Sequence, residues 1–308
     1  MKQVFACAAL LVFAVSGASA REMADIYVVT QVANTTGQQF TDWHTDLTLY
    51  NPHSYSLPVV VQFLEAGRDN TSGVPTVEFD VYPWETLNLW NVLGPNGFNR
   101  RGVNGALLVF ADDTLVDCTA PACDFAVFAR TYTISNRWNL DGEFGQAAPG
   151  YSAYYGLDWN VIGYLPQLMD DADFRTNVGI ASLTNGTVKV RVDLQNADGD
   201  IIDQRTYTFP PFFVAQWRLP RGVTGGTAAV YLTDGPASAL VFPYASVVNN
   251  SSGDAVTIEP QYTTVFESAA QFPGTARVRA LRERPELPSR ILEEGFSPEV
   301  LRRRPETR

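Results

Sequence analysis

The sequence predicts an all-β protein made of two tandem antiparallel β-sandwiches followed by a largely disordered C-terminal tail. Short segments of alternating apolar and polar residues recur along the chain with turn residues between them, which is typical of half-buried strands. The segments of the first half return in the second half. Residues 21–265 show no sustained 3.6-residue period, so long helices are not expected there.

Residues 1–20 are expected to be a signal peptide. Lys2 is followed by an apolar run from Val4 to Val15 and by Ala18-Ser19-Ala20, a typical cleavage sequence. The run is shorter than the ~20 apolar residues that a membrane-spanning helix needs. We therefore expect a secreted, periplasmic or cell-surface protein with no transmembrane segment after the signal peptide is removed.

Two β-sandwich domains are expected, at residues 22–150 and 151–265, because the chain matches itself. Residues 43–51 match residues 174–182 at an offset of 131, and the offset falls to 128 near residue 80. It falls to 122 where residues 105–110 match 227–232, and to 114 where 127–133 match 241–247. Each copy then has about 110–130 residues, the size of one sandwich domain.

Local signals place strands within the copies. Residues 188–194 alternate between valine or leucine and polar residues, as expected for a strand with one buried face. An Asp-Gly turn within residues 196–200 predicts a hairpin with a strand at 201–209. Pro83 and Pro211 are expected to follow strand ends because proline cannot donate to a central ladder.

The tail, residues 268–308, is expected to be disordered or to form a short helix. It is rich in Arg, Glu and Pro, and Ser297 before Pro298 is a weak helix-start signal. Nine Arg and six Glu after residue 276 give this end a charge of +3, whereas residues 21–276 carry −15. An acidic body repels phosphate groups, so nucleic acid is not an expected partner. Docking of the tail on a partner is the alternative to disorder.

Several strand and turn motifs are typical of one class of exported protein. They are Phe174-Arg-Thr-Asn-Val-Gly-Ile180, the Asp-Gly hairpin, Gly142-Glu-Phe-Gly-Gln146 and Tyr244-Ala-Ser-Val-Val-Asn249. Over residues 25–262 the chain thereby resembles bacterial exported proteins of tandem immunoglobulin-like β-sandwich repeats with no assigned activity. The resemblance implies two immunoglobulin-like domains. It implies no catalytic residue, because its motifs are structural.

The cysteines predict one disulfide. Cys118 and Cys123 are the two that remain after signal-peptide removal, and such a pair in an exported chain most simply forms a disulfide. A redox pair usually has C-x-x-C spacing, and a zinc site needs further ligands. We therefore favour a structural disulfide that closes a small loop.

The sequence does not predict an enzyme. It has no G-x-S-x-G, H-E-x-x-H or glycine-rich phosphate-binding motif. His44 shares a strand face with Asp46, so a histidine–carboxylate pair is geometrically possible, but an exposed strand histidine is the simpler interpretation. We expect no enzymatic activity and no cofactor.

Two acidic groups are candidate calcium ligands. They are Asp170, Asp171 and Asp173 before the second copy, and Asp198 and Asp200 in its hairpin. Calcium favours several carboxylate oxygens, and extracellular modules often bind it weakly. Neither group has EF-hand spacing, and solvated turns are the alternative interpretation of both.

A group of aromatic residues near the junction of the copies is a candidate ligand-binding surface: Trp138, Tyr151, Tyr154, Tyr155 and Trp159. Exposed rings can form a platform for sugars, whereas buried rings would pack within or between domains. We expect a non-catalytic exported protein with a structural, adhesive or partner-binding role, its partner a protein or a glycan. A carbohydrate-binding module that uses these aromatic residues is the alternative, and a hydrolase with a site between the domains is the third.

Overall fold

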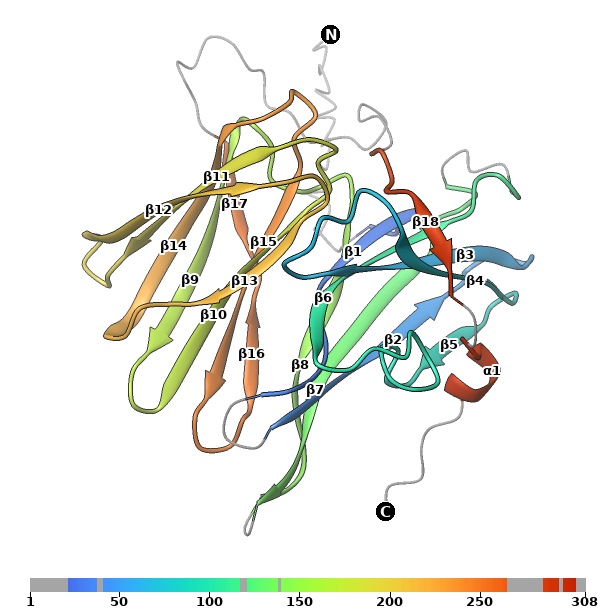
Figure 1. The fold of residues 1–308 in the computed structure, drawn as a ribbon, viewed down its shortest axis with the longest axis horizontal. Coiled ribbons are helices and arrows are strands. Elements are labelled where there is room, and N and C mark those ends of the chain that lie inside the picture. Colours follow the sequence, from blue (N-terminus) through green and yellow to red (C-terminus); the bar gives the residue numbers. More distant parts are fainter. Residues whose placement is uncertain are drawn as a thin grey trace, which may run out of the picture.

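The computed structural model describes residues 22–37, 41–116, 121–137, 140–264, 285–293 and 296–302. These residues form an all-β fold of mainly antiparallel sheets with one short helix (Figure 1). The expected signal peptide, residues 1–20, lies outside the described residues. Within the described ranges, no helix is long and apolar enough to cross a membrane.

Strands β1 to β8 form what we call the N-terminal unit. Their bounds are β1 Ile26–Thr36, β2 Asp42–Tyr50, β3 Leu57–Glu65, β4 Val74–Val81, β5 Thr86–Leu89, β6 Val103–Ala111, β7 Ala126–Arg137 and β8 Leu140–Ser152. One layer has the order β4-β3-β6-β1 and the other β5-β2-β7-β8. β8 joins the layers, because it pairs with β7 along most of its length and with β1 at its end. An apolar core that includes Leu47, Phe63 and Leu107 lies between them.

Strands β9 to β17 form the C-terminal unit. Their bounds are β9 Val161–Asp170, β10 Phe174–Ser182, β11 Val188–Gln195, β12 Ile201–Phe209, β13 Val214–Arg218, β14 Val223–Asp234, β15 Val241–Asn249, β16 Ala255–Ile258 and β17 Gln261–Thr264. The orders β12-β11-β14-β9 and β13-β10-β15-β16 repeat those of the N-terminal unit strand for strand. A second core, with Val178, Val190 and Val230, lies between these layers.

Strand β11 and its hairpin agree with the sequence pattern. The valine and leucine side chains of residues 188–194 face the core, and the main-chain N–H of Asn196 donates to the carbonyl of Asp200 at 2.9 Å in the turn to β12. The predicted offset of 122 is wrong by one residue. Leu107 pairs with Phe63 and Ala228 with Leu194, which gives an offset of 121. β14 pairs irregularly with both neighbours, and such irregularities are not visible in an alternation pattern.

The two units pack face to face through a third apolar cluster. Val28, Val60 and Leu108 of the N-terminal unit meet Ala181 and Phe242 of the C-terminal unit there. β1, β3 and β6 are therefore buried on both faces over most of their length, and β3 and β6 accordingly have few polar residues.

The described part of the tail packs along the open edge of the N-terminal unit, and we call residues 285–293 and 296–302 the strap (Figure 1). β18 (Arg290–Leu292) pairs in parallel with the start of β4, and α1 (Pro298–Leu301) is the predicted short helix. The expected disorder is not confirmed for these residues. The reason is that Phe296 and Leu301 reach the core between the layers, where burial of apolar area offsets the entropy of ordering.

Candidate functional site

The aromatic residues predicted near the junction lie against other parts of the chain. The Tyr151 ring lies 6.4 Å from the ring of Phe242, and the Tyr154 hydroxyl lies 3.2 Å from a carboxylate oxygen of Asp25. The Trp159 indole N–H donates to the carbonyl of Pro236 at 2.9 Å, and the Tyr155 hydroxyl lies 3.5 Å from Glu22. Trp138 lies outside the described residues. Tyr154 is buried, whereas Trp159 is exposed.

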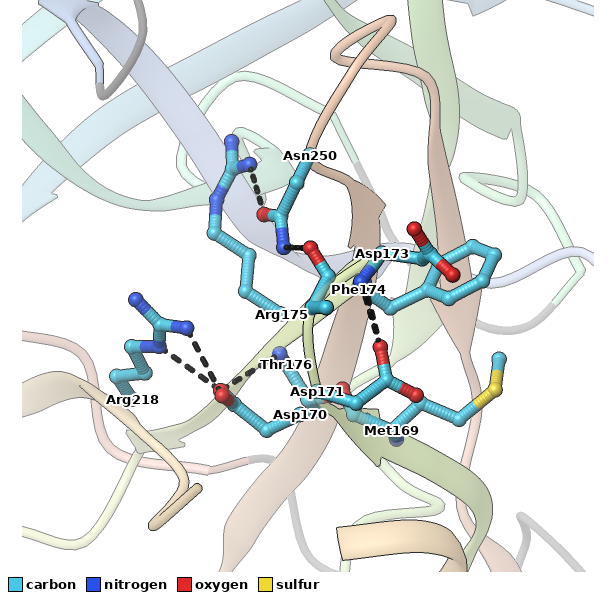
Figure 2. Close-up of polar contacts among 10 residues, drawn as sticks. Met169, Asp170, Asp171, Asp173, Phe174, Arg175, Thr176, Arg218 and Asn250 are labelled. Atoms are coloured by element: carbon cyan, nitrogen blue, oxygen red, sulfur yellow. Dashed lines mark hydrogen bonds and ion pairs between the residues drawn. The ribbon is translucent and has the colours of Figure 1, made fainter. Parts of the chain in front are cut away.

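With Thr176 and Arg218, Asp170 of the first acidic group forms what we call the polar knot (Figure 2). Asp170 is buried, whereas Asp171 is half-buried and Asp173 is exposed. The Asp170 carboxylate is fully buried and accepts two hydrogen bonds from Arg218, from Nε and Nη2, each at 2.8 Å. The Thr176 hydroxyl, beside it, accepts the Met169 main-chain N–H at 3.0 Å and donates to the Met169 carbonyl at 2.5 Å. A bidentate pair of this kind neutralises the buried carboxylate and fixes β9, β10 and β13 relative to one another.

Hydrogen bonds of the neighbouring residues hold the turns next to the polar knot. Asp171 accepts main-chain N–H groups from Asp173 at 2.9 Å and from Phe174 at 2.8 Å (Figure 2). The guanidinium of Arg175 is buried and donates to Asn250 Oδ1 at 3.0 Å. Burial, together with the nearby charge of Arg218, lowers the pKa of Arg175. The bond between Arg175 and Asn250 therefore joins the β9–β10 turn to the β15–β16 turn.

The second acidic group lies in the β11–β12 hairpin. Asn196 Oδ1 accepts the main-chain N–H groups of Asp198 at 3.0 Å and Asp200 at 2.9 Å. The structure thus holds the two acidic groups in different turns. In the described ranges, no group of three or more His, Cys, Asp or Glu side chains converges as a metal site would require.

His44 does not pair with Asp46. His44 Nδ1 lies 3.2 Å from Asn34 Oδ1, and Nε2 lies 3.3 Å from the carboxylate of Asp42. The Asp46 carboxylate accepts the main-chain N–H of Asn91 at 2.7 Å instead, and burial raises its pKa above the ordinary value. The possible histidine–carboxylate pair is therefore replaced by a contact with Asp42 at the end of the same strand.

Cys123 is buried at the edge of the N-terminal core. Cys118 lies outside the described residues, so the disulfide between the two stays a prediction.

An exposed group of aromatic side chains that the sequence did not single out lies at one end of the N-terminal unit. We call Tyr55, Tyr82 and Trp84 the aromatic rim; they are 42%, 55% and 61% exposed. The buried side chain of Asn51 donates to the carbonyls of Tyr55 at 2.8 Å and Tyr82 at 3.1 Å, and so ties the β2–β3 loop to the β4–β5 turn. His53 stacks on the Tyr55 ring at 5.0 Å.

The turn that carries Trp84 has a counterpart in the C-terminal unit. Trp84 has a φ of 60° and donates its main-chain N–H to the carbonyl of His53 at 3.2 Å. Phe212, 128 residues later, has a φ of 49° and donates to the carbonyl of Thr184 at 3.0 Å. Phe212 is 2% exposed, and its own carbonyl accepts from Asn70 of the N-terminal unit at 2.9 Å. The same turn therefore presents a buried ring in one unit and an exposed ring in the other.

The chain matches no known protein family and no curated protein. Its function is therefore inferred from its own sequence and geometry.

Proposed function

We propose that the protein is a non-catalytic exported protein of two tandem immunoglobulin-like β-sandwich domains, with a structural, adhesive or partner-binding role at or outside the cell envelope. The common strand order of the units supports two copies of one module. The binding role rests on one observation, the aromatic rim with Trp84 exposed on a left-handed turn.

The rim suits binding for two physical reasons. A non-glycine residue with positive φ costs of order 1–3 kcal/mol, and such strain clusters at functional sites. Exposed aromatic side chains also leave apolar area in water that a partner can cover. In the C-terminal unit, the ring of the equivalent turn is buried, and the main-chain carbonyl of Phe212 accepts a hydrogen bond from Asn70 of the other unit. In the N-terminal unit the equivalent turn leaves the Trp84 ring exposed, where a partner can cover it.

The second candidate function is that of a carbohydrate-binding module. We place its sugar-binding site at the aromatic rim instead of at the junction of the two units. The rim combines exposed rings with groups that can hydrogen-bond to hydroxyls. Glu85 accepts the Tyr82 main-chain N–H at 2.8 Å, and the guanidinium of Arg302 lies 5.2 Å from the Tyr82 ring centre. Rings beside charged hydrogen-bonding groups suit a ligand with both apolar C–H faces and hydroxyl groups, as a sugar has.

The test compares binding by the wild-type chain, Trp84→Ala and a matched control. Retention is measured on a glycan array and on cell-envelope preparations. Ile201→Ala is the control, because Ile201 is also an exposed apolar residue but lies on β12, outside the rim. We expect Trp84→Ala to lower retention at least tenfold and the control to leave it unchanged. Equal retention of all three chains, or none by any of them, would overturn the binding role of the rim.

A further inference from the structure

The N-terminal unit lacks an aromatic ring that the C-terminal unit has in its own sheet. In the C-terminal unit, Tyr207 packs on Trp217 with ring centres 4.3 Å apart. Trp217 pairs with Val178, and the residue in the same place of the N-terminal unit is Leu89, which pairs with Leu47. Leucine cannot supply the ring at this edge of the N-terminal core.

The strap supplies the missing ring. Phe296 stacks on Phe79, the counterpart of Tyr207, with ring centres 6.2 Å apart, and lies edge-on to Phe98 at 5.6 Å. Leu301 is 3% exposed within the N-terminal core, and its carbonyl accepts the main-chain N–H of Trp90 at 3.1 Å. We call the place that holds Phe296 and Leu301 the groove. Strap and groove together complete the core.

The strap also covers the edge of β4, which would otherwise present unpaired main-chain groups. Val74 donates its N–H to the carbonyl of Ser289 at 3.1 Å, and Glu293 donates to the carbonyl of Thr76 at 2.8 Å. Open strand edges are ready sites for pairing with another chain, and a donated segment removes that hazard.

Charge complementarity gives the strap its specificity. Arg290 of the strap lies 2.7 Å from Glu78, and Arg100 of the N-terminal unit lies 2.5 Å from Glu293 of the strap. In the first pair the strap carries the positive charge, and in the second it carries the negative charge. A strap with these signs reversed would meet like charges at both positions.

The strap is separated from the rest of the fold in sequence. Residues 265–284, a stretch of 20, lie between the end of β17 and the start of the strap. A chain of that length can span at most roughly 70 Å. The groove is made by β4, β5 and the loop after β5, none of which is close to the strap in sequence. Nothing in the groove thus requires that the strap come from the same chain.

We propose that the groove also accepts residues 285–302 of a second copy. Copies of the chain would then associate by inserting the strap of one copy into the groove of another. An incomplete β-sandwich completed by a segment of its neighbour is a known means of assembly in exported proteins. The inference extends the proposed structural role by a means of assembly and does not depend on the aromatic rim. The contact is heterologous, so it forms closed exchanged pairs or open chains.

Stacking of copies through their sheets is disfavoured by the charges on the outer face. The face of β3 that meets the C-terminal unit carries Val60 and Gln62. The corresponding positions on the outer face of β11 are Arg191 and Asp193, an ion pair with a separation of 2.7 Å. A polar terminal face stops repeats from adding further copies.

Two charge-reversed chains test the exchange. The groove variant carries Glu78→Arg and Arg100→Glu, and the tail variant carries Arg290→Glu and Glu293→Arg. In either variant alone the strap meets like charges in its own groove. In an equimolar mixture both kinds of groove find a complementary strap on the other chain. Native mass spectrometry at low salt is expected to show at least tenfold more dimer in the mixture than in either variant alone. A mixture with no more dimer than its components would overturn the exchange.

The chain with all four substitutions is the matched control. The two reversed pairs are again complementary within one molecule, so we expect a monomer. Its unfolding temperature should lie slightly below that of the wild type, because Arg290→Glu loses the contact of Arg290 with Asp112 at 3.8 Å. As much dimer from this chain as from the mixture would contradict the role assigned to the charges.

A second measurement does not need the groove variant to fold. A fluorescent peptide of residues 285–302 is titrated into the tail variant, whose own strap is repelled. We expect saturable binding, at least tenfold weaker for the peptide with Phe296→Ala. Equal binding of the two peptides, or binding of neither, would show that the groove does not accept a segment from outside.

Discussion

The substitution Leu301→Ala tests whether the strap is part of the N-terminal core. Leu301 comes from the far end of the chain and is buried, whereas Ile291 on the same strap is 60% exposed. If the strap only rested on the surface, the two residues would matter equally little. If the Leu301 side chain completes the core, Leu301→Ala destabilises the folded chain, whereas Ile291→Ala does not.

The magnitude follows from burial at the edge of a core. Leu→Ala changes in cores cost about 2–5 kcal/mol, depending on how far the site can collapse. Leu301 is the last residue of the short helix α1 and packs at the edge of the core, where the site can collapse, so we expect the lower half of this range, about 2–3 kcal/mol. The cost cannot exceed what the whole strap contributes, because a strap without its anchor can detach. Ile291→Ala is expected to cost less than about 0.5 kcal/mol.

The assay is equilibrium urea unfolding of the wild-type chain and both variants, followed by tryptophan fluorescence. For an m-value of about 2–3 kcal/mol/M, the expected loss moves the midpoint for Leu301→Ala down by about 1 M. The Ile291→Ala midpoint should stay within about 0.2 M of wild type. Coincident curves for Leu301→Ala and Ile291→Ala would refute the assignment of Leu301 to the core.

Three further outcomes are expected. Asp170→Asn leaves Arg218 without its bidentate partner and should lower the free energy of unfolding by about 3 kcal/mol, measured by urea titration. Phe212→Ala should cost about 3–5 kcal/mol by the same assay, and Trp84→Ala less than about 0.5 kcal/mol, because one ring is buried and the other exposed; equal costs would contradict the roles given to the two turns. Burial raises the pKa of Asp46, so the folded chain binds this proton at a higher pH than the unfolded chain. The wild type should therefore gain stability relative to Asp46→Asn as the pH falls from about 7 through that raised pKa, and a relative loss in unfolding titrations over this range would contradict the assignment.

The sequence was sufficient for the local features of the fold. The alternation in β11, the Asp-Gly turn after it and the short helix at Pro298 depend on neighbours in the chain, and each is found where predicted. Burial of β1 on both faces could not be predicted from β1 itself, because the second face is covered by the other unit. An arginine- and glutamate-rich tail indicates disorder by composition, although Phe296 and Leu301 are enough to anchor it.

The candidate site was less accessible to sequence reasoning. Trp84 and Phe212 occupy equivalent turns, and only the contacts of the folded units show that one ring is buried and the other exposed. The sequence signal that could have pointed to the rim is the match of Tyr82-Pro83-Trp84 with Pro210-Pro211-Phe212. It places an aromatic residue in the same turn of both units. The buried pair of Asp170 and Arg218 spans 48 residues, a separation that local pattern does not reach.

Hydrogen exchange of the full chain tests most directly whether the strap is folded as part of the N-terminal unit. The strap amides of Ser289, Glu293 and Ser297 donate to the carbonyls of Thr71, Thr76 and Asn96, and Trp90 in the groove donates to the carbonyl of Leu301. Such amides exchange only when the segment opens. We expect peptides covering residues 285–293 and 296–302 to exchange far more slowly than an unstructured chain, and Leu301→Ala to remove this protection. Exchange of these peptides at the unstructured rate in the wild-type chain would contradict the claim.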